Sequence, residues 1–593
     1  MDKEALKKVY RHSLAHVLAK AAVELFGKDT QLAIGPEIED GFYYDFKFPR
    51  PLTNEDLKSL ETKMREILHR KESWTRRVVS KEEALKLFKG QIYKEEMIRE
   101  LPEDETITTY ATGDDFMDLC RGPHVENSSD LLNAAWQLRS MSGSYWRGDE
   151  KRDQLTRIYA YAFPTREELK QHLNFIKEAK ERDHKKIGPM LDLFLFEDTA
   201  PGMPYWLPRG WKLFNALLNF WREVHDAHGY EEMSAPLINN RRLWVTSGHW
   251  AHYKENMFLV PGASKEFDSE DTYAVKPMNC PNAIMAYMHK TRSYKDLPIR
   301  YNTVDVIHRK EKSGELNGLF RVQMFRQDDA HIFIREDQIA DEMGDIMDIA
   351  DEIYGTLGMT CKAELSTRPD DFMGDPATWD VAEKELRAIL DKKYGAGNYE
   401  VNEGDGAFYG PKIDLKMRDA LGREWQVGTL QLDFQLPLNF GVKYIDQDGR
   451  QKQPVVLHRA IFGSMERFIG ILIENFKGAF PFWLSPMQVA IVPIRDTHND
   501  YAKEVASALK KAGIRVEADY ADRNMREKIK NFKAMKDPYI LVLGDEEKAN
   551  GTVSLNVRGT NDQVKDLPLQ DFIAMCREMN ASRSLDLLEK PLK

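Results

Sequence analysis

Apolar residues at helical intervals mark the first segment of the chain. Residues 11–20 (RHSLAHVLAK) are rich in Ala and Leu and predict a helix. Because residues four apart share a helix face, His12 and His16 are expected to lie side by side. Together with strand-like runs at 41–46 and 157–161, this helix predicts an α+β domain over residues 1–164.

A charged connector is expected next, over residues 165–190. Thr165 and Glu168 have the spacing of a capping box, in which each side chain accepts from the backbone amide of the other residue. The apolar pattern of residues 211–237 fits any helix followed by an extended strand. It predicts a larger domain over residues 191–486, entered by a helix at 211–229 and an extended segment at 233–237.

Proline residues mark the last boundary. Pro481 and Pro486 bracket a short stretch that cannot continue a regular element. Beyond them, apolar runs alternate with helical stretches, which predicts a small α/β domain over residues 487–593. The apolar runs lie at 489–492, 514–516, 539–543 and 553–555.

Composition narrows the class of protein. With 593 residues and 42% hydrophobic content, the chain is too long for one core and is typical of globular proteins. It has no run of about 18 apolar residues and no apolar signal-peptide centre, so we expect no membrane association and a cytoplasmic location. Four cysteines are too few for a disulfide framework. Because the net charge is −11, contact with nucleic acid requires basic residues gathered on one face.

Three residues far apart in the sequence, Cys280, His331 and His458, are candidate zinc ligands. One thiolate and two imidazoles would give tetrahedral zinc three protein ligands and one open position, as in a zinc that touches substrate. The intervals match no compact zinc motif, so spacing alone also fits a small buried thiol and two core histidines. The surrounding segments decide the interpretation.

A second cluster combines His12 and His16 with Cys120 and His124. Gly and Pro lie between the Cys and the second His, which predicts a loop. The set suits zinc, and imidazoles with a pKa near neutrality can also carry a proton to or from water. Without the loop residues, a pair of surface histidines on a helix would explain the pattern equally well.

Six segments supply a resemblance to a known family. They are residues 307–311 (IHRKE) and 318–322 (GLFRV), which we call motif 2, residues 462–468 (FGSMERF), which we call motif 3, and the segments 276–281 (KPMNCP), 365–369 (LSTRP) and 408–412 (FYGPK). With them the chain resembles the threonyl-tRNA synthetases, which are class II aminoacyl-tRNA synthetases. The resemblance implies an α+β editing domain, a class II catalytic domain built on an antiparallel sheet, and a C-terminal α/β anticodon-binding domain. The small ubiquitin-like domain found before the editing helix in many members is expected to be absent.

The resemblance also implies a ligase that joins L-threonine to tRNA(Thr) through threonyl-adenylate, with ATP and Mg²⁺. Arg309 is then expected at the α-phosphate, Glu311 at the adenine, and Arg321 with Arg467 at the γ-phosphate. His249 is the expected helper in acyl transfer. The helix and strand at 211–237 would form a homodimer contact.

For the amino acid, the resemblance implies one zinc per subunit, held by Cys280, His331 and His458, that binds the amino and hydroxyl groups of threonine. The expected remainder of the pocket is Gln327, Asp329, Tyr409 and Gln431. Serine also carries a hydroxyl and differs by one methyl, which discriminates by only about 1–3 kcal/mol, so a hydrolytic editing site is needed. Its expected residues are His12, His16, Lys94, Asp118, Cys120 and His124.

The C-terminal domain departs from the family pattern. Glu547 matches, but Asn556 stands where relatives have an Arg, and Asn cannot neutralise phosphate. Both are expected to contact the anticodon. Two alternatives stay open: another class IIa synthetase of the prolyl or histidyl kind, or a synthetase-like RNA-binding protein without catalysis.

Overall fold

The computed structural model describes residues 3–263, 265–267, 269–561 and 563–588. Residues 1–2 of the predicted first domain and residues 589–593 of the predicted last domain lie outside the described residues. The chain divides into two compact units, Met1–Glu178 and Ala179–Lys593. The division falls inside helix α5 (Arg166–Arg182), which has no buried side chain. The capping box is confirmed: Thr165 N donates to Glu168 Oε2 at 3.2 Å, and Glu168 N to Thr165 Oγ1 at 3.2 Å. Among the described residues, no helix has the length and apolarity needed to cross a bilayer.

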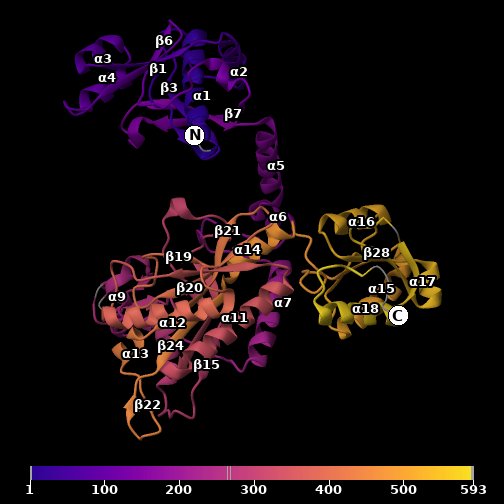
Figure 1. The fold of residues 1–593 in the computed structure, drawn as a ribbon. Helices are drawn as coiled ribbons and strands as arrows, with labels where there is room; N and C mark the ends of the chain where they lie inside the picture. The colour runs from indigo at the N-terminus through magenta and orange to yellow at the C-terminus, as the bar shows by residue number, and fades with distance from the viewer. Residues whose placement is uncertain (1–2, 264, 268, 562, 589–593) are drawn as a thin grey trace. The chain divides into compact units, whose positions relative to one another are not determined.

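The first unit packs a long helix against an antiparallel sheet (Figure 1). The predicted helix is confirmed as α1 (Lys3–Phe26), whose Leu14, Val17 and Leu18 are fully buried. The sheet runs in the order β1-β3-β8-β7, with β2 beside β3. Its strands are β1 (Gln31–Leu32), β2 (Glu37–Ile38), β3 (Gly41–Lys47), β7 (Ala135–Tyr145) and β8 (Gln154–Phe163).

A smaller sheet, β4-β5-β6, completes this unit. The residues after β6 run without regular structure up to His124, so the loop predicted around Cys120 is confirmed. The elements are α2 (Asn54–His69), β4 (Trp74–Val79), α3 (Lys81–Leu87), α4 (Ile92–Glu100), β5 (Ile107–Thr112) and β6 (Phe116–Leu119).

The second unit is built on a large sheet with the order β11-β15-β17-β24-β21-β20-β18-β19, and β16 pairs with β17. All neighbours are antiparallel except the outermost pairs, β11 with β15 and β18 with β19, so the predicted antiparallel sheet is confirmed. Its strands are β11 (Glu231–Glu232), β15 (Ile299–Thr303), β16 (Val306–His308), β17 (Met324–Ile334), β18 (Cys361–Ser366), β19 (Glu400–Asn402), β20 (Lys412–Arg418), β21 (Glu424–Asp433) and β24 (Val455–Ser464).

Strand β17 shows how this sheet separates core from site. Successive side chains of a strand point to opposite faces. Ala330 and Ile332 enter the main core, which also contains residues of α7 (Pro208–Ala227), α11 (Ile339–Thr356), α12 (Pro376–Tyr394) and α14 (Met465–Asn475) (Figure 1). Asp329 and His331 therefore point to the other face. Helix α7 begins at Pro208, before the predicted Trp211, because proline is favourable in the first helical turn.

Short elements complete the second unit. They are α6 (His184–Met190), β9 (Phe194–Leu195), β10 (Tyr205–Trp206), β12 (Ile238–Asn240), α8 (Arg241–Thr246), α9 (His249–His252), β13 (Leu259–Val260), β14 (Tyr273–Val275), α10 (Cys280–Tyr287), α13 (Gln435–Phe440), β22 (Tyr444–Ile445) and β23 (Gln451–Lys452). Residues 233–237, predicted to be extended, follow β11 and form no strand themselves.

The C-terminal part has the predicted α/β character, with a sheet in the order β26-β25-β27-β28-β29. The first three strands are parallel and the last two antiparallel. Strand β29 was not predicted, because its polar edge sequence has no apolar run. The elements are β25 (Val489–Pro493), α15 (Asn499–Lys511), β26 (Val516–Ala518), α16 (Met525–Ala534), β27 (Tyr539–Leu543), α17 (Asp545–Asn550), β28 (Thr552–Val557), β29 (Gln563–Pro568) and α18 (Leu569–Ser582).

Candidate functional site

The three predicted zinc ligands come together on the face of the large sheet that is opposite the main core. His331 of β17 and His458 of β24 are directly paired across the two strands, and their ring centroids are 4.9 Å apart. Cys280 is the first residue of α10. One donor atom from each of the three residues lies within 4.8 Å of the others, and all three side chains are buried.

The hydrogen bonding of these residues fits a metal. Both ring nitrogens of His331 and Nδ1 of His458 are buried without a hydrogen-bond partner, which is costly for a polar atom. Burial, followed by the nearby His458 and Arg459, holds the pKa of His331 well below its usual range, so its ring is neutral as a ligand must be. Nε2 of His458 lies 2.8 Å from Oδ2 of Asp433, a carboxylate–histidine contact typical of metal ligands.

A cavity of about 300 Å³ opens beside these residues. Asp329 lines it, accepts from Asn279 Nδ2 at 3.2 Å, and has its pKa raised to about 6 by burial. Tyr409 OH donates to the side-chain oxygen of Gln431. The predicted threonine-pocket residues thus share one cavity, lined by Gln327, Asp329, Tyr409 and Gln431 together with Cys280 and His458.

A second cavity, of about 330 Å³, adjoins the first and shares Arg309, Gln327 and Thr429 with it. Its lining includes Arg321 and Arg467. Burial, followed by the charges of Arg309 and Arg321, lowers the pKa of Arg467, as expected where three guanidinium groups converge. This concentration of positive charge suits a polyanion. The fourth predicted residue, Glu311, also lines the cavity and accepts from Arg321 Nε and Nη2 at 3.0 and 2.9 Å.

His249 is buried and lines neither of these cavities. Its Nδ1 lies 2.8 Å from Ser247 Oγ, and its Nε2 lies 3.1 Å from the sulfur of Met278. Burial lowers its pKa to about 4, so the ring is neutral near pH 7. Met278, which lines the smaller cavity, therefore separates His249 from it.

The second predicted cluster assembles in the first unit. His12, His16, Cys120 and His124 each place one donor atom within 4.8 Å of the others. Cys120 Sγ lies 3.2 Å from Nε2 of both His12 and His124, and Ser13 Oγ lies 3.1 Å from His124 Nδ1. Burial is the main reason that the pKa values of the three histidines are lowered. Burial also raises the pKa of Cys120 to about 11, so the thiol and the rings are neutral near pH 7.

Lys94 and Asp118 form a buried ion pair beside this cluster. Lys94 Nζ lies 2.6 Å from Asp118 Oδ1, Tyr44 OH donates to Asp118 Oδ2 at 2.6 Å, and His16 Nε2 is 3.8 Å from the same oxygen. A cavity of about 460 Å³ is lined by Lys94 and Asp118 together with His12, His16 and Cys120, but not by Tyr44 or His124.

Glu547 and Asn556 lie in the C-terminal part and join neither site. Glu547, on α17, accepts from Ser554 Oγ at 2.6 Å and from Gly544 N at 2.8 Å. Asn556, on β28, donates to the carbonyl of Ile540 at 3.3 Å. Both side chains are partly exposed.

Sequence reasoning missed several residues that hold the site. Asn279 binds Asp329, Asp433 binds His458, and Asp328 accepts from the backbone of residues 461–463. Asn279 and Asp328 adjoin predicted residues, and that adjacency was the only available signal. Nothing in the sequence links Asp433 to a histidine that lies 25 positions away.

Three family descriptions match the chain. Residues 264–476 match the tRNA synthetase class II core domain (G, H, P, S and T), and residues 488–579 match the anticodon binding domain. Residues 107–159 match the threonyl and alanyl tRNA synthetase second additional domain.

Individual proteins match over nearly the whole chain. It is 47% identical to the threonine–tRNA ligase of Thermotoga petrophila over 98% of this chain and 89% of that protein. It is 49% identical to the threonine–tRNA ligase of Desulforamulus reducens over 96% of this chain and 88% of that protein. A crystal structure described as the RNA binding domain of threonyl-tRNA synthetase from Cryptosporidium parvum aligns with a TM-score of 0.64 and 40% identity, over 67% of this chain and 98% of that one. The chain therefore belongs to the threonine–tRNA ligase family of class II aminoacyl-tRNA synthetases.

Proposed function

We propose that this protein activates L-threonine with ATP and transfers it to tRNA(Thr). One observation carries the proposal: the buried Cys280, His331 and His458, with unpartnered ring nitrogens, lie beside a cavity that shares Arg309 with an arginine-lined neighbour. The cavity beside the candidate ligands suits an amino acid, and the arginine-lined cavity suits a nucleotide. Family membership supports the same reaction.

Activation requires the carboxylate of the amino acid to attack the α-phosphorus of ATP in line, with release of pyrophosphate. Arg309 lines both cavities, so its guanidinium can hold the attacking carboxylate and the α-phosphate together. Arg321 and Arg467 would neutralise the outer phosphates, with Mg²⁺ bound to the same phosphate chain. Catalysis here is positioning and charge stabilisation, because no side chain needs to form a covalent bond.

Selection of threonine would rest on the three candidate ligands and the polar groups around them. When held by Cys280, His331 and His458, zinc supplies an open position for an amino acid that carries both an amino and a hydroxyl group. Asp329 can pair with the substrate ammonium, and the hydrogen-bonded Tyr409 and Gln431 line the same cavity. A site whose polar groups require the hydroxyl rejects valine by roughly 10⁴–10⁵.

Exchange of pyrophosphate into ATP tests this proposal. Threonine should support rapid exchange, serine slower exchange, and valine almost none, and a strong zinc chelator should abolish the threonine reaction. Proline and histidine should be inactive. Exchange that depends on proline or histidine, or no exchange with any amino acid, would reject the proposal in favour of the two alternative readings of the sequence.

We further propose that the first unit hydrolyses seryl-tRNA(Thr). The neutral rings of His12 and His16 line the cavity and can accept a proton from an attacking water. The Lys94–Asp118 pair would orient the substrate at the same cavity. Since the Cys120 thiol already contacts the rings of His12 and His124, we propose that the reaction uses these side chains and water without a resident metal.

The editing proposal has its own test. His12→Ala should leave pyrophosphate exchange unchanged, because the two sites lie in separate compact units, while seryl-tRNA(Thr) accumulates. His69→Ala is the matched control, since His69 is an exposed histidine of the same unit, on α2. Clearance of seryl-tRNA at the wild-type rate by the His12 variant would contradict the assignment.

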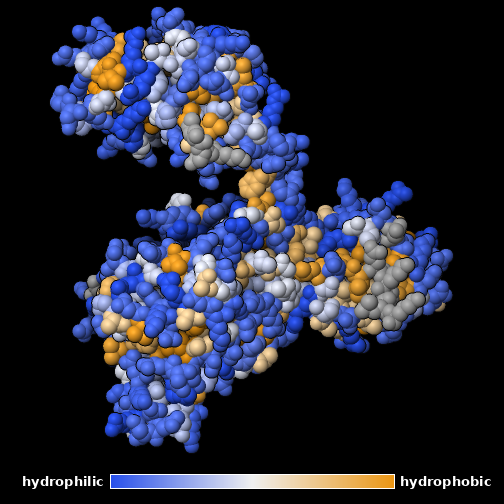
Figure 2. Space-filling model, in the orientation of Figure 1, coloured by the Kyte–Doolittle hydropathy of each residue, from blue (hydrophilic) through white to orange (hydrophobic). Residues whose placement is uncertain are grey.

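The proposed function also implies two partners, tRNA(Thr) and a second copy of this chain. We propose that tRNA(Thr) is read partly through Glu547 and Asn556, and that the protein acts in the cytoplasm as a homodimer. An apolar patch supports the dimer: Leu237, Ile238, Met285, Met288 and Leu438 are each at least 40% exposed. Figure 2 shows hydrophobic surface gathered near α13, the helix that carries Leu438 and packs against α10.

A further inference from the structure

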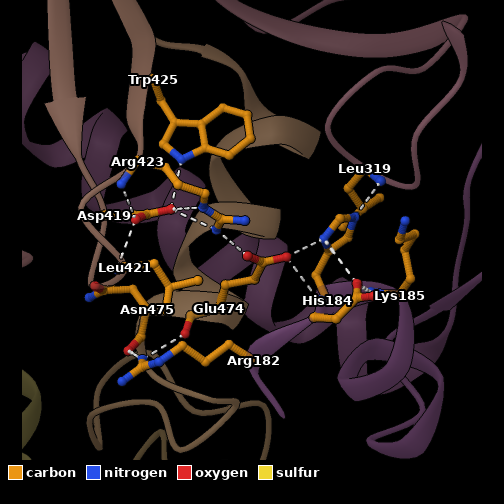
Figure 3. A network of polar contacts seen from close by, with 11 residues as sticks. Arg182, His184, Lys185, Leu319, Asp419, Leu421, Arg423, Trp425, Glu474 and Asn475 are labelled. Atoms are coloured by element: carbon orange, nitrogen blue, oxygen red, sulfur yellow. Dashed lines mark hydrogen bonds and ion pairs between the residues drawn. The ribbon is translucent and has the colours of Figure 1, made fainter. Parts of the chain in front are cut away.

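A buried histidine outside the cavities contacts the backbone of motif 2. His184 begins α6 and is fully buried. Its Nδ1 lies 2.7 Å from Glu474 Oε1, and its Nε2 accepts from the backbone N–H of Leu319 at 3.0 Å (Figure 3). Since a carboxylate only accepts and an amide only donates, the partners require a neutral ring with its proton on Nδ1.

The segment that His184 holds lines the arginine-rich cavity. Leu319 is followed by Phe320 and Arg321, both of which belong to that lining. The ring of Phe320 lies between His184 and Trp425, with centroid distances of 4.0 and 4.4 Å. The carbonyl of Phe320 accepts from Arg467 Nε at 3.1 Å. One side of the nucleotide cavity thus rests on the imidazole.

The other ring nitrogen ties this contact to the end of the motif 3 helix. Glu474, near the end of α14, accepts from both the ring and the backbone N–H of His184 and pairs with Arg423. Arg423 is in turn held by Asp419, at 2.7 Å from its Nε (Figure 3). The buried carboxylate is therefore compensated, and its orientation is fixed.

A glycine permits the close approach. Gly318 has a φ of +51°, and a Cβ added there would lie 2.3 Å from His184 Nε2 and 2.7 Å from Lys185 Cγ. A side chain at residue 318 would displace the imidazole from the N–H of Leu319. The absence of a side chain at Gly318 and the orientation of the His184 ring are therefore both needed for the hydrogen bond from the Leu319 N–H.

We propose that His184 is a positioning residue for the activation step: its Nδ1-protonated ring, locked by Glu474, holds the Leu319-Phe320-Arg321 segment where ATP phosphates bind. The inference rests on the proposed function of this cavity. No catalytic contact is assigned to the histidine, because it acts through the motif 2 backbone.

The test is pyrophosphate exchange with the full chain, recording KM and kcat for ATP and KM for threonine. His184→Phe keeps an aromatic ring against Phe320 but removes the acceptor, so KM for ATP should rise by about tenfold, which corresponds to about 1.4 kcal/mol. KM for threonine should stay unchanged. His184→Gln retains an acceptor and should restore most of the affinity for ATP.

His498→Phe is the matched control. His498 is also buried, and its ring accepts from the Arg495 N–H at 3.1 Å and lies 2.9 Å from Asp545, but it is in the C-terminal part. It should lower the melting temperature without raising KM for ATP. If His184→Phe fails to fold, Gly318→Ala replaces it and should raise KM for ATP in the same way.

The inference would be overturned by an unchanged KM for ATP in the His184→Phe or Gly318→Ala variant, or by equal increases in KM for ATP and threonine, which indicate general loosening. A Gln variant as impaired as the Phe variant would also overturn it, since the acceptor would then not matter. A wild-type protein without threonine-dependent exchange would instead reject the proposed function.

Discussion

Single residues in this protein acquire their chemistry from burial and from the number of partners around them. His331 has no hydrogen-bond partner at either ring nitrogen, whereas His184, equally buried, has one at each. The first environment suits a metal ligand, because only an added group can satisfy the ring. The second suits a structural contact. The same residue type therefore serves two purposes within one compact unit.

The residue-scale prediction concerns two cysteines of the second unit. Cys280→Ser should reduce the zinc content of purified protein from about one per chain to near zero and abolish threonine-dependent exchange, because serine is a poor zinc ligand. Cys361→Ser is the control, since Cys361 lies on β18 and belongs to no candidate metal group among the described residues. Elemental analysis measures the metal. Full zinc content in the Cys280 variant would contradict the ligand assignment.

At the scale of elements, one buried carboxylate joins a strand, a strand end and a helix. Asp328 of β17 accepts from the backbone N–H groups of Ile461, Phe462 and Gly463 at 2.8–3.0 Å. It also accepts from Trp221 Nε1 of α7 at 3.1 Å. The preceding and following residues of β17 face the cavity, so Asp328 fixes the strand from behind.

Asp328→Asn should therefore be severe. The new amide NH₂ would meet donors where an acceptor is needed, which costs about 3 kcal/mol of the free energy of unfolding. Exchange activity should fall with stability, because the displaced strand carries Asp329 and His331. Asp341→Asn, an exposed acid on α11, is the matched control. Thermal unfolding checks the prediction, and equal melting temperatures for the two variants would contradict it.

Helix α7 supplies a pH-dependent term. Burial, followed by the charge of Arg459, holds the pKa of His225 well below its usual range. The unfolded chain binds a proton at this residue below about pH 6.5 while the folded chain does not. Its contribution is therefore complete above about pH 6.5 and is lost as pH falls, by at most about 1.4 kcal/mol per pH unit.

His225→Phe removes this titration. The melting temperature of the variant should fall less than that of the wild type when pH is lowered from about 7.5 to about 5.5. Differential scanning calorimetry at several pH values provides the measurement. The same decrease in both proteins would show that His225 does not titrate on unfolding.

At the scale of the whole molecule, the two compact units have separate cores and separate sites. Separate cores allow activation and hydrolysis to be altered independently, as the His12 experiment requires. The apolar patch on the second unit is the contact surface of the proposed homodimer, because apolar patches on protein surfaces are common interaction sites.

Met285→Glu should convert the proposed homodimer into a monomer. Met285 is 51% exposed on α10, and a charge at this point would be buried without a partner in the interface. Val381→Glu is the control, since Val381 is 59% exposed on α12, outside the patch. Sedimentation velocity gives the molecular mass. A wild-type monomer, or a dimeric Met285 variant, would contradict the patch assignment.

Local patterns determined much of this protein in advance. Apolar spacing predicted α1 and the α/β character of the C-terminal part, because helix and strand periods depend on near neighbours. The spacing of Thr165 and Glu168 predicted the capping box of α5. Residue types within the motifs identified the family and the candidate ligands. Strand β29 was missed because an edge strand with polar residues has no periodic apolar signal.

The tertiary structure decided which groups share a site and which atoms have no partner. Cross-strand register placed His331 opposite His458, and chain folding brought Asp433 to one of them and left the other without any hydrogen bond. It also set His184 against Leu319, 135 positions away, where a glycine leaves room. Sequence fixes the donors and acceptors that a chain carries, but their pairing depends on long-range packing, which no local pattern encodes.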